Sequence, residues 1–184
     1  MIIIATIFSV AGFAQIDIDS ARVLGIGANV TVTGIVTHAF NSPTDSNLRY
    51  IEDNTGGMAL YSGSVSGFQR GDEVTVSGPL KDYNGLLEMD PVNSNTTNTT
   101  GNTLSPQIVT PIQIGEATES ELIQIDNAIF NNGGSVFTGN TAFDFMANGE
   151  SGKIFLKTGH SLVGSLIPMG TVTLIGVSSQ HTYN

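Results

Sequence analysis

Apolar and polar residues alternate along short stretches of the chain, and clusters of glycine and asparagine separate these stretches. Val30 and Val32 enclose the polar Thr31, and the same alternation returns at Val74 and Val76. Alternation with a period of two is typical of strands that bury one face, and Gly- and Asn-rich breaks are typical of turns. We therefore expect an all-β chain.

One alternating phrase occurs three times, as GANVTVTGIVTH at Gly27–His38, GDEVTVSGPLKDYNGLLEM at Gly71–Met89 and GTVTLIGVSSQHTYN at Gly170–Asn184. In each copy a glycine follows the alternating residues: Gly34, Gly78 and Gly176. A glycine inside a strand marks a bulge or bend, at which a strand can leave one sheet and enter another. The phrases therefore predict long, bent strands that curl around small barrels.

The stretch LRYIEDNTGGMALYSG, Leu48–Gly63, predicts a hairpin between the first two phrases. Its turn is DNTGG, in which we expect the carboxylate of Asp53 to accept backbone N–H bonds. Strict alternation sends one set of side chains inward and the other outward. The inward set is Ile51, Met58 and Leu60, and the outward set is Tyr50, Glu52, Ala59 and Tyr61. After the second phrase, KDYNG predicts a turn and LLEM, Leu86–Met89, a fifth strand.

These phrases, in this order, resemble the OB-fold, a five-stranded Greek-key barrel. They are more closely similar to the OB-type modules of secreted bacterial proteins, which accompany extracellular nucleases, phosphoesterases or large surface proteins. The resemblance covers about Ala21–Pro91. It implies a ligand groove on the outward face of the first hairpin, bordered by the loops AFNSPTDSN and KDYNG.

The rest of the chain predicts a second, more divergent copy of this module. ELIQIDNAIF predicts a strand, AFDFMANGESGKIFLKTG a hairpin and the third phrase a fourth strand, with no residues left for a fifth. The polar tract Asn93–Thr103 has no periodicity and is predicted to be a loop. We therefore expect two tandem five-stranded OB-like Greek-key barrels, the second lacking its last strand, in a fragment of a longer protein with other domains. The expected divisions are a signal peptide at 1–14, a first barrel at 21–92, a linker with room for a strand at 93–112 and a second barrel at 113–184.

The start of the chain and its charge bear on its location and partners. MIIIATIFSVAGFAQ is too short to span a bilayer and ends in small residues, as a secretory signal does, although no Lys or Arg precedes it. We therefore expect a truncated signal, with a buried first strand as the alternative, and a mature chain that is secreted or at the cell surface without inserting into the membrane. The net charge of −10 should repel nucleic-acid phosphates over most of the surface, because cationic contacts drive non-specific binding.

The sequence contains no recognisable catalytic or metal-binding pattern. His38, His160 and His181 lie in separate segments without the spacing of metal ligands. There is no cysteine, no G-x-S-x-G elbow and no phosphate-binding loop. Neighbouring carboxylates such as Asp72 and Glu73 would point in opposite directions on a strand. We therefore expect a protein that is not an enzyme and that requires neither a metal nor a cofactor.

Two groups of residues could bind a ligand by stacking on aromatic rings. The first lies on the outward face of the first hairpin and in KDYNG: Tyr50, Tyr61, Lys81 and Tyr83. The alternative is that the tyrosines pack against the linker or the second barrel. The second group lies on the outward face of GKIFLKTG: Lys153, Phe155 and Lys157. Its alternative is an ordinary solvated strand whose charge Asp144 and Glu150 neutralise.

Three functional hypotheses follow from these features. The first is a non-catalytic extracellular binding or accessory module, whose ligand is single-stranded nucleic acid or a glycan, bound weakly. The second is a structural spacer within a larger cell-surface protein. The third is the N-terminal part of a secreted nuclease or phosphoesterase whose catalytic domain lies beyond Asn184. OB barrels host unrelated ligands, so the fold alone does not choose among these hypotheses.

Overall fold

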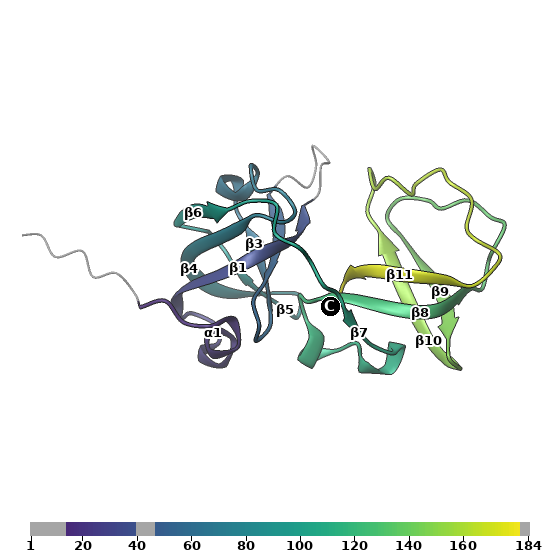
Figure 1. Ribbon diagram of the computed structural model, residues 1–184, viewed down its shortest axis with the longest axis horizontal. Coiled ribbons are helices and arrows are strands. Elements are labelled where there is room, and N and C mark those ends of the chain that lie inside the picture. The colour runs from purple at the N-terminus through teal and green to yellow at the C-terminus, as the bar shows by residue number, and fades with distance from the viewer. Residues whose placement is uncertain (1–13, 40–46, 181–184) are drawn as a thin grey trace, which may run out of the picture.

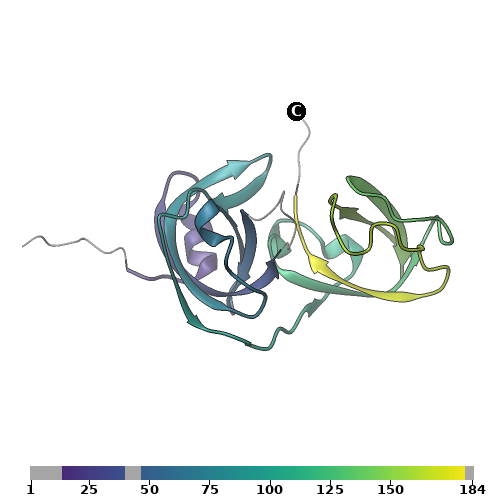
Figure 2. The same cartoon turned by 90° about the horizontal axis from the view of Figure 1, so that it is seen from above.

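The structure is a computed structural model and describes residues 14–39 and 47–180. The predicted signal segment before Ala14, residues 40–46 of the predicted groove loop, and His181 lie outside this part. The described chain forms two β-sheets that lie side by side, with one short α-helix (Figure 1, Figure 2). No helix in it is long and apolar enough to cross a membrane. The prediction of a mostly β chain is confirmed.

The first sheet consists of β1 (Asn29–Ala39), β2 (Leu48–Glu52), β3 (Gly57–Tyr61), β4 (Glu73–Tyr83), β5 (Leu86–Met89) and β6 (Ser94–Thr99). The strand order is β1-β2-β3-β5-β4-β6, and β1 also pairs with β4. The first five strands therefore form a closed ring, in which β3 and β5 are parallel and the other neighbours antiparallel. The helix α1 (Ile18–Leu24) precedes the ring, and the 3-10 turn η1 (Gly63–Val65) follows β3.

Glycines lie where β1 and β4 change partners, as the repeated phrase predicted. β1 pairs with β4 up to Ile35 and with β2 beyond it, immediately after Gly34. β4 pairs with β1 up to Pro79 and with β5 beyond it, immediately after Gly78. A Cβ atom on Gly78 would lie 2.3 Å from the carbonyl oxygen of Pro91. The missing side chain therefore permits a close backbone approach at the bend.

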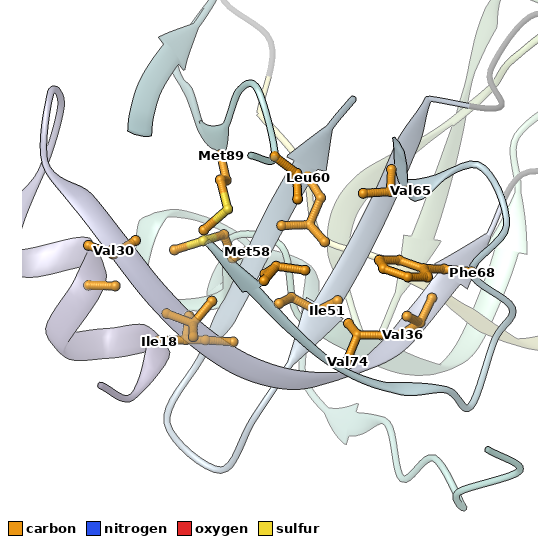
Figure 3. Close-up of a cluster of buried hydrophobic side chains, with 14 of the residues drawn as sticks. Ile18, Val30, Val36, Ile51, Met58, Leu60, Val65, Phe68, Val74 and Met89 are labelled. Carbon is orange, nitrogen blue, oxygen red and sulfur yellow. The ribbon is translucent and has the colours of Figure 1, made fainter. Parts of the chain in front are cut away.

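The core of the first sheet lies inside the ring (Figure 3). The three side chains predicted to point inward from the first hairpin, Ile51, Met58 and Leu60, are fully buried there. Ile18 of α1 and Met89 of β5 join them from opposite ends of this part of the sequence. The period-two reading of the hairpin is therefore confirmed for its inward face.

Two elements of the first sheet differ from the prediction. The tract Asn93–Thr103, predicted to be a loop within a linker that left room for a strand, contains β6, which pairs antiparallel with β4. Every residue of β6 is exposed, so the strand has no buried face to produce an apolar alternation in the sequence. The helix α1 was also not predicted. Asp17 caps its start by accepting a hydrogen bond from the Ser20 backbone N–H at 2.6 Å.

The second sheet consists of β7 (Gln107–Ile108), β8 (Leu122–Phe130), β9 (Thr141–Ala147), β10 (Glu150–Leu156) and β11 (Val172–Val177). Its order is β10-β9-β8-β11, and β7 pairs in parallel with β8. The 3-10 turns η2 (Pro111–Gln113) and η3 (Glu116–Thr118) lie between β7 and β8. The predicted strand, hairpin and final strand are confirmed. Edge-to-face aromatic contacts fill the core, with ring centroids 5.4 Å apart for Phe130 and Phe137 and 4.9 Å apart for Phe137 and Phe143.

The second sheet is open where the first is closed. In the first sheet, β5 lies between β3 and β4 and completes the ring. In the second sheet, β10 and β11 are the two ends of the strand order, and the described part of the chain places no strand between them.

Buried polar contacts join the two sheets. The Arg22 side chain on α1 is 13% exposed, and its Nη2 donates to Glu119 at 2.9 Å and to Glu116 at 3.1 Å, just before β8. The carboxylate of Glu52, at the end of β2, accepts the backbone N–H of Leu122 at 2.7 Å. These contacts fix the start of β8 against the first sheet.

We expect the fragment 113–184 not to fold cooperatively by itself. It would carry the open sheet and would lose the contacts to Arg22 and Glu52, and small domains have little stability to spare. Thermal unfolding followed by circular dichroism and the dispersion of amide NMR signals show whether the fragment folds cooperatively. Residues 14–106, which hold the closed ring, serve as a matched control and should melt cooperatively. A cooperative transition with dispersed amide signals for 113–184 would contradict the prediction.

Candidate functional site

The outward side chains of the first sheet form what we call the outer face: Leu48, Tyr50, Ala59, Tyr61, Lys81, Tyr83, Leu86 and Glu88. Strand register fixes their neighbours. Tyr50 lies opposite Ala59, Ala59 opposite Glu88, and Glu88 opposite Lys81, so these four side chains form one row across β2, β3, β5 and β4. This is the face on which the OB resemblance implied a ligand groove.

The second sheet covers part of the outer face. Tyr50, Ala59 and Leu86 are buried in a cluster with Leu48 and with Val177 of β11. The Tyr50 hydroxyl lies 3.5 Å from the Ser179 hydroxyl. The Tyr50 ring is therefore not available to stack on a ligand. The sequence left open whether the tyrosines bind a ligand or pack against another part of the chain. Tyr50 packs against the second sheet.

The other three predicted residues of this group remain accessible but do not converge. Tyr61 is 47% exposed and Tyr83 is 58% exposed. Tyr61 lies beyond the Tyr50–Lys81 row at the end where β2 begins, because it pairs with Leu48. Tyr83 lies beyond the row at the other end, because it pairs with Leu86. The outer face thus offers two separate exposed rings.

Carboxylates surround Lys81. Its Nζ lies 2.9 Å from a carboxylate oxygen of Asp90. Glu88, opposite Lys81 on β5, is only 5% exposed. The pKa of Glu88 is raised to about 7, mainly by burial and also by the charge of Asp90, while Lys81 opposes the rise. Above neutral pH this part of the outer face is therefore net acidic, which disfavours a phosphate ligand at Lys81.

Replacing Glu88 with glutamine should stabilise the protein at pH 8 but not at pH 4. A carboxyl group whose folded-state pKa is raised from 4.5 to about 7 favours the native state below pH 4.5, and this contribution is lost as the pH rises to 7. We expect the variant to gain about 3 kcal/mol over the wild type at pH 8 and to match it near pH 4. Urea unfolding across this pH range measures the difference. A gain in stability that is the same at every pH would contradict a raised pKa for Glu88.

The second predicted group, on β10, is also dispersed. Phe155 is 54% exposed. Lys153 forms an ion pair with Asp144 of β9, as the alternative reading allowed. Lys157 lies just after β10 and is half-buried, near the first sheet rather than beside Lys153. The three residues therefore do not form one site.

Three cationic side chains and the imidazole of His160, a group that the sequence did not predict, lie near His38 at the end of β1. Burial is the main cause that lowers the pKa of His38 to about 4, and the nearby charges of His160, Arg70, Arg49 and Lys157 lower it further. We call these four residues the basic cluster. They include three of the chain's six Lys and Arg side chains and come from β2 and from segments next to β4 and β10. No local pattern could reveal the cluster, because its members are far apart in the sequence.

The members of the basic cluster differ in role. Arg49 is 2% exposed and donates to the carbonyl oxygens of Phe68 at 3.0 Å and Ser66 at 2.7 Å, so it fixes the segment after β3. Arg70 is exposed, and Lys157 and His160 are half-buried. Tyr61 lies at the same end of the ring, opposite Leu48, which precedes Arg49. An exposed aromatic ring and accessible positive charges therefore occupy one end of the first sheet.

Acidic side chains line an open hollow of about 600 Å³ beside α1, and they include Asp17, Asp53 and Glu73. Asp53 accepts the Thr55 backbone N–H at 2.7 Å and the Ile18 backbone N–H at 2.9 Å, which confirms that it caps its turn and shows that it also anchors α1. A hydrogen bond from Ser20 holds the pKa of Asp17 below its usual value. These two carboxylates support the backbone.

Among the described residues, no group of three His, Cys, Asp or Glu side chains could hold a metal ion.

Comparison with known proteins gives one partial similarity. No family model matches the chain. Over 84 residues, or 44% of the chain, the sequence is 36% identical to Endonuclease YhcR of Bacillus subtilis (strain 168). The match covers 7% of that protein's length, so the similarity concerns a small part of the endonuclease. The predicted resemblance to modules that accompany nucleases is supported to this extent.

Proposed function

We propose that the chain is a non-catalytic accessory part of an extracellular nuclease-type protein, and that it binds single-stranded nucleic acid weakly. We assign the closed ring to the OB type and the second sheet to an open version of it. The observation that carries the binding proposal is the basic cluster at the same end of the first sheet as Tyr61. The similarity to a part of an endonuclease supports the nucleic-acid class of ligand.

Charge argues for a localised contact rather than a broad one. The chain carries a net charge of −10, so most of its surface repels phosphates. At the basic cluster, Arg70 precedes β4 of the first sheet and Lys157 follows β10 of the second, and both act on His38. Two phosphate contacts correspond to a logarithmic salt slope of roughly −1 to −2 for a single strand. Affinity is therefore weak and only mildly dependent on salt.

Stacking supplies the remaining affinity. The Tyr61 ring is 47% exposed at the same end of the ring as the cluster. Stacking of a base on an aromatic side chain contributes about 1–3 kcal/mol and tolerates any base. We expect one or two nucleotides to be held by Tyr61 while neighbouring phosphates reach Arg70 and Lys157.

Titration of labelled oligonucleotides over a salt series tests this proposal. Tyr61→Ala should weaken binding about 5- to 150-fold without changing the salt slope. Lys157→Ala should reduce the slope by about 0.7. Lys153→Ala is the matched control, because Lys153 is an exposed lysine outside the basic cluster, and it should alter neither quantity. Equal effects of Lys153→Ala and Lys157→Ala would contradict a localised site.

The burial of Tyr50 favours a second candidate function, a structural spacer. The second sheet occupies the part of the outer face where the OB resemblance implied a groove, so the face serves to join the two sheets. A spacer would bind neither oligonucleotides nor glycans in the same titrations. A glycan-binding module would bind neutral sugars with almost no salt dependence.

A further inference from the structure

We infer that the contact between the two sheets is a pH-sensitive joint, which holds more tightly in mildly acidic solution than above neutral pH. Among the described residues, the joint brings together four carboxylates and one cation: Glu52 at the end of β2, Glu116, Glu119 and Glu121 just before β8, and Arg22 on α1. Carboxylates that are crowded together favour their uncharged forms. The pH response is independent of the nucleic-acid ligand proposed above, because the basic cluster contributes no residue to the joint.

The single charge of Arg22 cannot balance all four carboxylates. Its Nη2 donates to Glu119 at 2.9 Å and to Glu116 at 3.1 Å, and its Nη1 donates to the Gly57 carbonyl oxygen at 3.3 Å. Within the described chain, the second carboxylate oxygen of Glu119, Oε1, is buried and accepts no hydrogen bond. The negative charge of the joint is therefore only partly neutralised.

Glu52 and Glu121 approach each other across the joint, and both are half-buried. The Glu52 carboxylate accepts the backbone N–H of Leu122 at 2.7 Å, and Leu122 directly follows Glu121. On the side of the first sheet, Asp53 and Glu73 line the same hollow as Glu52 and Leu122. The described residues that line this hollow include no lysine or arginine. Ionisation of Glu52 therefore adds charge to surroundings that are already negative.

The same groups set the acidity of the two glutamates. Burial is the largest cause that raises the pKa of Glu121, the charges of Glu52 and Asp19 also raise it, and Arg22 opposes the rise. Burial is likewise the largest cause that raises the pKa of Glu52, where the Leu122 N–H opposes the rise and the charge of Asp53 adds to it.

The sign of the pH response follows from these directions. A carboxyl group whose pKa is raised in the folded state favours that state below its ordinary pKa of 4.5, and this contribution is lost as the pH rises through the raised value. Opening the joint would return the side chains of Glu52 and Glu121 to water and separate their charges. The joint therefore holds best when both are protonated and weakens as both ionise.

Amide hydrogen exchange at Leu122, measured on the 184-residue chain and corrected for the intrinsic effect of pH, tests the joint. Protection of this amide should fall several-fold between pH 5 and pH 8. Glu121→Gln should reduce the fall, and the double variant with Glu52→Gln should abolish it, because a glutamine oxygen can still accept the Leu122 N–H. Glu150→Gln is the matched control. Glu150 also accepts a backbone N–H, that of Ile112 at 3.2 Å, but it lies at the start of β10 and outside the joint, so the fall should persist.

Two results for Leu122 would overturn the inference directly: equal protection at both pH values in the wild-type chain, or a fall that persists in the double variant. A fall that Glu150→Gln abolishes as completely as the double variant would also overturn it, because the overall charge of the chain would then be the cause.

Discussion

Replacing Gly57 with alanine is expected to lower the free energy of unfolding by about 3 kcal/mol and to loosen the contact between the two sheets. A Cβ atom at Gly57 would lie 2.3 Å from the carbonyl carbon of Ser120 and 2.4 Å from its oxygen. These are backbone atoms, and they cannot move aside alone. Ser120 donates its N–H to Ser178 at 2.8 Å, and Ser178 donates to Glu121 at 2.9 Å, so a shift of Ser120 would break the start of the second sheet.

The adjacent glycine provides the control. A Cβ atom at Gly56 would make only ordinary contacts, 3.8 Å from Ile18 and 3.9 Å from Arg22. Gly56→Ala should therefore be neutral or stabilising by up to about 1 kcal/mol, because alanine restricts the unfolded chain. Urea unfolding followed by circular dichroism compares the two, and hydrogen exchange at the Leu122 amide reports on the contact itself. Similar unfolding midpoints for both variants would show that the sheets are not held together at Gly57.

Replacing Glu119 with alanine is expected to cost about 3–5 kcal/mol of stability. The Glu119 side chain is 1% exposed and accepts the Arg22 guanidinium at 2.9 Å, and it also accepts the Leu87 backbone N–H at 3.4 Å. Removing the carboxylate leaves a mostly buried positive charge with its exposed partner Glu116 alone. An unbalanced buried charge is far more costly than the loss of a surface ion pair.

Glu116 supplies the matched comparison, since it pairs with the same Nη2 atom of Arg22. Its side chain is 79% exposed, so Glu116→Ala should cost at most about 1 kcal/mol. The two variants are compared by urea unfolding at pH 7. If Glu116→Ala proves as costly as Glu119→Ala, burial does not govern the strength of this contact.

Strands with one buried face could be predicted from the sequence, whereas β6, which has none, could not. The alternation in Leu48–Gly63 identified a hairpin and its inward residues, because burial on one side of a strand leaves a period of two. β6 left no such pattern, since all of its side chains face water. The start of α1 did carry a signal, in Asp17 three residues before Ser20.

The candidate site depended on contacts between distant parts of the chain. Alternation placed Tyr50 and Tyr61 on the same outward face, but it could not show that Val177 and Ser179 would cover Tyr50 and leave Tyr61 exposed. Similarly, GKIFLKTG grouped Lys153 with Lys157, whereas the fold pairs the first with Asp144 and brings the second near His38. Local periodicity fixes the face of a side chain but contains no information about which other segment lies over that face.

The sequence by itself determined the strands that bury one face, the bends of β1 and β4 and the inward side chains of the first hairpin, because these depend on local alternation and on glycine at close backbone approaches. The tertiary structure alone decided how the two sheets meet, which half of the outer face is buried, and where positive charges gather on an acidic chain. Those features depend on residues far apart in the sequence, such as Arg22 with Glu119 and His38 with Lys157, whose proximity only the folded chain creates.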